Sequence, residues 1–472
     1  MGTLHPYSVA DDHHRHHHEG GDEERPPLPM PQTHEPNKKP LDAGALFVLK
    51  SKGGWLHCGY HMTTSIVAPP VLSLPFAVAS LGWIGGVVFL MIAAMVTFYS
   101  YNLVSLVLEH HAHKGNRLLR FRDMADDILG PGWGKYFVGP VQFVVCYGCV
   151  IASILLGAQC MKTIYLLSRP DGSMKLYEFV IILGAFTLVL AQIPSFHSLR
   201  HINLLSLILC LVYDISAMVA SVYIGNSNKG PPRDYSLQGD SGTRIFNAFN
   251  AIAIITTAYG NGMIPEIQAT IAPPVKGKMF KGLCVCYVVV IITFFGVSIT
   301  GYWAFGNQAA GTVLMNFYGN GNPLVPKWFL YIVNTLTFIQ VSAVGLVYLQ
   351  PTNEILERTF ADPQKGEFSH RNVMPRLISR SISIAIATLI AAMLPFFGDI
   401  NGVIGAFGFI PLDFVLPVIF YNLTFRPTKL NPIFWVNTSI ATIFSVVAVI
   451  SVVAAVRQIT LDAGTYRLFA NV

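Results

Sequence analysis

The stretch that decides the fold reads Ser65-Ile-Val-Ala-Pro-Pro-Val-Leu-Ser-Leu-Pro75, and it lies at the centre of an apolar segment from Trp55 to Trp83. The segment is long enough to span a bilayer. Its prolines argue against one continuous helix, because each proline removes an N–H group and clashes with the preceding turn. Backbone groups freed in hydrocarbon must be paired by protein or face a polar cavity. The stretch therefore predicts either a packed kink or a binding site at an interrupted helix.

The composition is typical of a membrane protein. Hydrophobic residues make up 53% of the 472 residues, while charged residues make up only 12%, against about 25% in soluble domains. Apolar runs of about 20 residues recur along the chain, which predicts a polytopic, all-α membrane protein. The formal net charge of +6 is then interpreted through the loops, and it is no indication of nucleic-acid binding.

Two regions are predicted from this pattern. Residues 1–50 are polar and include the cluster His13-His14-Arg15-His16-His17-His18, so we expect a disordered cytoplasmic tail. Residues 51–472 form the transmembrane domain, in which we expect eleven spans. The spans are predicted at 54–80, 82–108, 135–166, 176–194, 200–224, 243–272, 279–305, 326–360, 376–395, 399–423 and 430–456.

The positive charges predict the orientation of these spans. Most of the 31 Lys and Arg residues lie in the N-terminal tail and in the loops on the same side of the membrane. Because cytoplasmic loops carry an excess of Lys and Arg, the N-terminus is predicted to be cytoplasmic. An odd number of spans then places the C-terminus outside the cell.

A second interruption is predicted in the sixth span, which reads Thr256-Thr-Ala-Tyr-Gly-Asn-Gly-Met-Ile-Pro-Glu266. It follows the first by about 190 residues and five spans, and such paired interruptions indicate the binding site of a secondary transporter. Helices that start in mid-membrane offer N–H groups to a carboxylate, and helices that end there offer carbonyl groups to an ammonium. The pair predicts a zwitterionic ligand, such as an amino acid.

The candidate substrate-binding residues surround the two interruptions or face them from the third span. Ordinary helix packing is the alternative for each of them, and for the tyrosines it is about equally supported. They are Ser65, Ile66, Val67, Ala68, Tyr147, Thr256, Thr257, Tyr259, Gly260 and Asn261.

Carboxyl groups inside apolar spans are candidates for proton coupling, because an ionised carboxylate is expensive there. Glu266 follows Pro265 and could take up the coupling proton, bind a substrate ammonium, or simply stabilise the start of a helix. Asp214 in the fifth span is the second candidate for a proton relay, with pairing inside the bundle as the alternative. Asp413 in the tenth span is ranked with it.

Other classes of protein have less support. No nucleophile–base pair and no phosphate-binding loop is present, so we expect neither an enzyme nor an ATP-driven pump. No cofactor and no metal site is predicted, since Cys146-x-x-Cys149 lies in an apolar run where cysteines pack as small hydrophobic residues. A membrane sensor that does not transport its ligand stays open as an alternative.

Several motifs resemble those of a known family, the plant amino acid/auxin permeases, and some are similar to the plasma-membrane GABA transporters within it. The family motifs are Val71-Leu-Ser-Leu-Pro75, Leu81-Gly-Trp83, Tyr259-Gly-Asn-Gly262, Pro265-Glu-Ile-Gln-Ala-Thr270 and Gly301-Tyr-Trp-Ala-Phe-Gly306. The motifs similar to GABA transporters are Asp42–Lys52, Pro194–Arg200 and Gly408–Pro417.

The resemblance implies a leucine-transporter-like fold, with inverted five-helix repeats at about 54–224 and 243–423 and an extra helix at about 430–456. It further implies import of GABA and related ω-amino acids across the plasma membrane by symport with protons. The expected partners are the small-molecule substrate, protons and the lipid bilayer. A broad-specificity neutral amino acid or proline permease is the alternative.

Overall fold

In the computed structural model, the regular secondary structure of the described residues is helical, apart from an isolated bridge between Gly53 and Ile271. Turns and loops join the helices. The predicted tail at 1–50 and most of the Pro194–Arg200 motif lie outside the described residues. The described residues are 53–192, 199–227, 230–271, 275, 277–319, 321–357 and 369–465.

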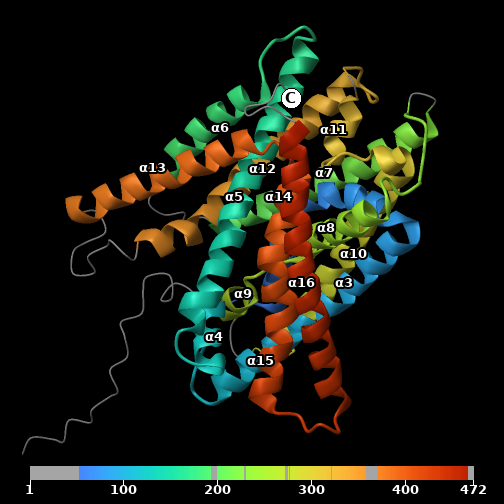
Figure 1. Ribbon diagram of the computed structural model, residues 1–472. Helices are drawn as coiled ribbons and strands as arrows, with labels where there is room; N and C mark the ends of the chain where they lie inside the picture. Colours follow the sequence, from blue (N-terminus) through green and yellow to red (C-terminus); the bar gives the residue numbers. More distant parts are fainter. Residues whose placement is uncertain are drawn as a thin grey trace, which may run out of the picture. The chain divides into compact units, whose positions relative to one another are not determined.

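Figure 1 shows the helices in chain order from blue to red. The first half contains α2 (Trp55–Ile66), the 3-10 helix η1 (Pro69–Ser73), α3 (Leu74–His113), α4 (Phe121–Leu129), η2 (Gly134–Val138), α5 (Gly139–Ser168), α6 (Leu176–Ala191) and α7 (Leu199–Asn226). The second half contains α8 (Ser241–Tyr259), α9 (Ile264–Ala269), α10 (Lys278–Phe305), η3 (Gly306–Gln308), α11 (Val313–Tyr318), α12 (Lys327–Glu357), α13 (His370–Met393), α14 (Phe397–Ile404), the π-helical η4 (Gly405–Val415), α15 (Leu416–Phe425) and α16 (Pro432–Thr465).

Within the described ranges, eight helical segments are long and apolar enough to cross a membrane, which confirms an all-helical, multi-pass membrane protein. The predicted spans at 54–80, 176–194 and 243–272 are absent from this set. The first of them is interrupted between α2 and η1, and the last between α8 and α9. The remaining one is the 16-residue α6. The eight segments are Pro69–His113, Gly134–Ser168, Leu204–Asn226, Lys278–Gln308, Lys327–Leu349, Val373–Met393, Phe397–Phe425 and Pro432–Ala463.

Helix α3 contains a sharp kink at Gly82. The helix has 40 residues, about twice what a bilayer requires. Gly82 has φ 73° and ψ 174°, a backbone conformation that is essentially restricted to glycine. The kink falls between the first two predicted spans, so the first span continues through η1 to Leu81 and the second begins at Trp83.

Replacing Gly82 by alanine is expected to destabilise the protein by about 1–3 kcal/mol, because a Cβ atom is strained at this φ and ψ. Thermal unfolding of the purified protein in detergent should show a lower midpoint. Gly85→Ala in the same helix is the matched control, since Gly85 has no such backbone strain and its added Cβ would lie 3.5 Å from the nearest atom. Equal midpoints for the two variants would contradict this role of Gly82.

The outward faces of the long helices are apolar. Along α13, Ile378, Ile382, Ile386 and Leu389 recur at intervals of three or four residues, and each is about half exposed. This spacing places them on one side of the helix. A stripe of this kind fits contact with the hydrocarbon of a bilayer.

The two interrupted segments lie together inside the helical bundle. Helix α12 packs along α5 (Figure 1), and α10 packs on α2. Between these helices, η1 contacts α8, α14, α7 and α10. The packing therefore brings the first interruption, at 67–68, against the helix that ends at the second.

Candidate functional site

The first interruption joins α2 to η1 through two extended residues, Val67 and Ala68. The Val67 N–H donates to the Thr63 carbonyl at 2.8 Å, and the Val67 carbonyl accepts from Cys210 Sγ at 3.2 Å. Helix η1 then begins with Pro69 and Pro70, which have no N–H group. The start of η1 therefore offers fewer donors to a carboxylate than the sequence predicted.

The second interruption lies between Tyr259, where α8 ends, and Ile264, where α9 begins. Two side chains pair its free carbonyl groups. Tyr101 Oη donates to the Tyr259 carbonyl at 2.8 Å, and Gln142 Nε2 donates to the Gly262 carbonyl at 3.3 Å. These bonds let the helix end inside the bundle at low cost, because buried carbonyl groups are expensive only when unpaired.

Asp413 supplies the acceptors that the second interruption requires. The N–H groups of Asn261 and Gly262 donate to its two carboxyl oxygens, each at 3.0 Å. Asp413 is buried and lies in η4, a π-helical segment of the kind often found at functional sites. The sequence suggested Asp413 for a proton relay, and the structure adds that its carboxyl group also holds the backbone of the second interruption.

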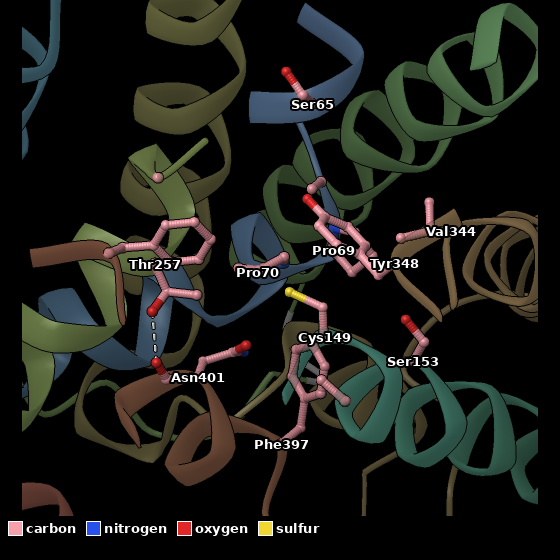
Figure 2. Close-up of a pocket in the computed structure, with 14 residues that line it drawn as sticks. Ser65, Pro69, Pro70, Cys149, Ser153, Thr257, Val344, Tyr348, Phe397 and Asn401 are labelled. Carbon is pink, nitrogen blue, oxygen red and sulfur yellow. Dashed lines mark hydrogen bonds between the residues drawn. The ribbon is translucent and has the colours of Figure 1, made fainter. Parts of the chain in front are cut away.

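A small cavity, called cavity one here, lies between the two interruptions. Figure 2 shows side chains from α5, α8, α12 and α14 around Pro69 and Pro70. None of the lining residues carries a formal charge, which suits a ligand without net charge. They are Ser65, Ala68, Pro69, Pro70, Cys149, Ala152, Ser153, Thr257, Gly260, Val344, Tyr348, Phe397, Asn401 and Phe409.

Asn401 provides the most informative polar group of cavity one. Its side-chain Nδ2 donates to Ser73 Oγ at 3.2 Å. Its backbone carbonyl accepts from Thr257 Oγ1 at 2.6 Å (Figure 2). Its Oδ1 is buried and accepts no hydrogen bond from the residues that the structure describes. An unpaired buried acceptor favours a ligand that brings a donor, such as an ammonium group.

Sequence reasoning missed Asn401. A polar signal was present, because Asp399 and Asn401 stand two residues apart near the start of the tenth predicted span. Pro395, Gly398 and Gly402 flank this pair in the sequence, but only the fold shows that Asn401 lies against Ser73.

Four of the predicted substrate-binding residues line cavity one: Ser65, Ala68, Thr257 and Gly260. Glycine is required at position 260, because an added Cβ atom would collide with the Phe409 ring. Phe409 also lines the cavity, so this glycine allows the ring to close one wall of it.

The other predicted residues near the interruptions do not line cavity one. Ile66 and Val67 are buried in the bundle. Thr256 Oγ1 donates back to the Ala253 carbonyl at 2.8 Å. The Tyr259 ring packs edge-on against Phe294, with a centroid distance of 4.8 Å.

Tyr147 is directed elsewhere too. Its Oη donates to the Ser383 carbonyl at 2.7 Å, and its ring stacks on Phe143. This contact joins α5 to α13, and Tyr147 lines neither cavity described here.

A second cavity, called cavity two here, holds the predicted residues Asn261 and Glu266. It is the larger of the two cavities. Glu266 Oε1 accepts from the Phe121 N–H at 3.3 Å, whereas Oε2 is buried without a partner among the described residues. The lining residues are Arg120, Arg122, Gln142, Val145, Cys146, Asn261, Gly262, Met263, Glu266, Tyr348 and Leu412.

Asp214 is fully buried in α7, and neither carboxyl oxygen has a partner within the described ranges. One turn earlier, Cys210 donates to the Val67 carbonyl at the first interruption. Residues four apart share a helix face, so Asp214 lies on the face of α7 that is directed to this interruption. It lines neither cavity.

Possible metal ligands do not gather in the structure. The described ranges contain no group of three or more His, Cys, Asp and Glu residues that could hold a metal ion. The seven cysteines, including Cys146 and Cys149, are free thiols.

The fold and the site define a multi-pass membrane protein with a cavity between two interrupted helices. Residues 51–459 match the family described as transmembrane amino acid transporter protein. The chain therefore belongs to this family and is a transporter rather than an enzyme, which confirms the resemblance noted in the sequence.

Two plant relatives agree with this assignment. The chain is 63% identical to GABA transporter 1 of Arabidopsis thaliana over 92% of its own length and 96% of that protein. It is 29% identical to lysine histidine transporter-like 1 of the same plant, over 88% and 90% of the two chains. A solved chain of a Na+-coupled sialic acid symporter, in a substrate-bound outward-open state, gives a TM-score of 0.49 at 12% identity, covering 91% of this chain and 96% of that one.

Proposed function

We propose that this transporter is a proton-coupled symporter that imports GABA and related ω-amino acids across the plasma membrane by alternating access. The observation that carries the proposal is that a single cavity is bounded by both helix interruptions, through Ala68 and Pro69 on one side and Thr257 and Gly260 on the other. A ligand held there touches both halves of the proposed repeat, so movement of one half against the other can change its access.

The substrate class is inferred from the lining and from a relative that is 63% identical. An uncharged lining with the free acceptor Asn401 Oδ1 supports a zwitterion, because the ammonium finds an acceptor without adding net charge. The relative that is 63% identical is named as a GABA transporter, which favours GABA within this class.

Proton coupling is assigned to Glu266 and Asp214. An ionised carboxylate without a partner is far more expensive to bury than the neutral acid, and both residues have carboxyl oxygens without partners. A proton taken up from the acidic outside then stabilises the loaded state. Glu266 lines cavity two next to the second interruption. Asp214 lies on the face of α7 that is directed to the first interruption.

The proposed topology has eleven spans with a 5+5 inverted repeat, a cytoplasmic N-terminus and an extracellular C-terminus. The eight long apolar segments supply eight spans. The other three are α2 with η1 and the start of α3, the short helix α6, and α8 with α9. The excess of Lys and Arg on the side of the N-terminus supports the orientation.

The test is uptake of labelled GABA by cells that express the protein, at several external pH values, with and without a protonophore. Uptake should rise with acidity, collapse with the protonophore and resist competition by excess proline and α-amino acids. Strong competition would instead identify a broad-specificity permease. No uptake despite surface expression would overturn the transport proposal and favour a sensor.

A further inference from the structure

Cavity one and cavity two follow each other along two elements of the structure. On α5, Ser153 and Cys149 line cavity one, whereas Cys146 and Gln142 line cavity two, one helical turn further. Consecutive turns of a helix are about 5.4 Å apart. The second interruption shows the same order, since Gly260 faces cavity one and the residues that follow it face cavity two.

Tyr348 of α12 lines both cavities. Figure 2 shows its ring beside Pro69 at the side of cavity one. Its side chain is therefore a wall that the two cavities share.

Cavity two contains polar groups that the protein leaves unpaired. The side chain of Asn261 is fully buried, and neither its Oδ1 nor its Nδ2 bonds to any residue that the structure describes. Only the backbone N–H of Asn261 is used, toward Asp413. Glu266 Oε2 is unpaired in the same way. Because leaving such groups unpaired costs free energy, they indicate a ligand with both donors and acceptors.

The charges around cavity two complement a zwitterion. Arg120 and Arg122 contribute positive charge to its lining, and Glu266 contributes a carboxyl group. We propose that cavity two is a second amino-acid-binding site, which holds the carboxylate of the substrate near the arginines and its ammonium near Glu266 and Asn261. This inference rests on the proposed transport of ω-amino acids and adds a second binding position next to the central site.

The number of labelled GABA molecules bound per chain tests this site. Equilibrium binding to the purified, full-length protein in detergent should saturate at about two molecules of GABA per chain. Asn261→Ala should reduce this to about one, with at least about a tenfold loss of affinity at the second site. The substitution removes no hydrogen bond made by the side chain and keeps the backbone bond to Asp413, so the protein should fold normally.

Two further variants make the assignment specific. Arg122→Gln should also abolish the second equivalent, while Lys114→Gln should not, because Lys114 is an exposed residue between α3 and α4 that lines neither cavity. Gly260→Ala should instead abolish binding of the GABA molecule in cavity one, since the added Cβ atom displaces the Phe409 ring.

The outcomes separate this proposal from the proposed function. The second site would be overturned if the wild type binds one GABA molecule per chain and Asn261→Ala and Arg122→Gln bind the same amount. Loss of that molecule in Gly260→Ala would then leave the central site intact. No GABA binding to any protein, together with no GABA uptake, would overturn both. Two equivalents with the loss pattern described above would support the site.

Discussion

Replacing Asp413 by asparagine should reduce labelled GABA uptake by at least about tenfold at unchanged surface expression. The carboxyl group accepts the N–H groups of Asn261 and Gly262. Asparagine replaces one acceptor oxygen by an NH₂ group, which leaves one of these N–H groups unpaired at a cost of about 1–3 kcal/mol. If the working geometry of the interruption depends on that bond, about 1.4 kcal/mol already corresponds to a tenfold change in rate.

Asp171→Asn is the matched control for this substitution. Asp171 is exposed in the loop between α5 and α6, so its replacement should leave uptake unchanged. Tyr101→Phe removes the donor to the Tyr259 carbonyl on the other side of the interruption and should show a smaller loss. Wild-type uptake by Asp413→Asn at equal surface levels would show that the interruption does not depend on this carboxyl group.

Replacing Glu266 by glutamine should abolish the rise of uptake with external acidity and reduce GABA transport to background. Glutamine keeps the size of the side chain and can still accept from the Phe121 N–H, but it cannot release or bind a proton near neutral pH. The measurement is the pH profile of labelled GABA uptake in cells in which the variant reaches the membrane.

Glu178→Gln provides the comparison, because Glu178 caps the start of α6 and lines neither cavity. It should keep the wild-type pH profile. Undiminished transport by Glu266→Gln with an unchanged pH dependence would remove Glu266 from proton coupling. Asp214→Asn would then be the variant to measure, given the unpaired oxygens of Asp214.

The interruptions of the helices were predictable because their causes are local. Proline cannot continue a helix ladder, so Pro69, Pro70 and Pro75 mark the first interruption in the sequence itself. The boundary between the first two spans was also readable, since Gly82 adopts a conformation that few other residues tolerate. Ser65 and Thr257 were found because they lie close to these breaks.

The partners of the interruptions were not predictable, since they come from distant segments. Asp413 and Tyr101 reach the second interruption across separations of 152 and 158 residues. Asn401 meets Ser73 across 328 residues. No periodicity indicates such contacts. The division of the predicted site between two cavities has the same origin, because the direction of each side chain depends on how α5, α8 and α12 pack.

The most direct test of the central site is the protection of Cys149 by GABA. Cys149 lines cavity one, whereas the partly exposed Cys284 of α10 lines neither cavity. The rate at which N-ethylmaleimide modifies each thiol in the purified protein is read by mass spectrometry, with and without GABA. At ten times its Kd, GABA should slow the modification of Cys149 about tenfold and leave Cys284 unchanged. Equal rates at Cys149 in a protein that transports GABA would show that the substrate does not bind between the two interruptions.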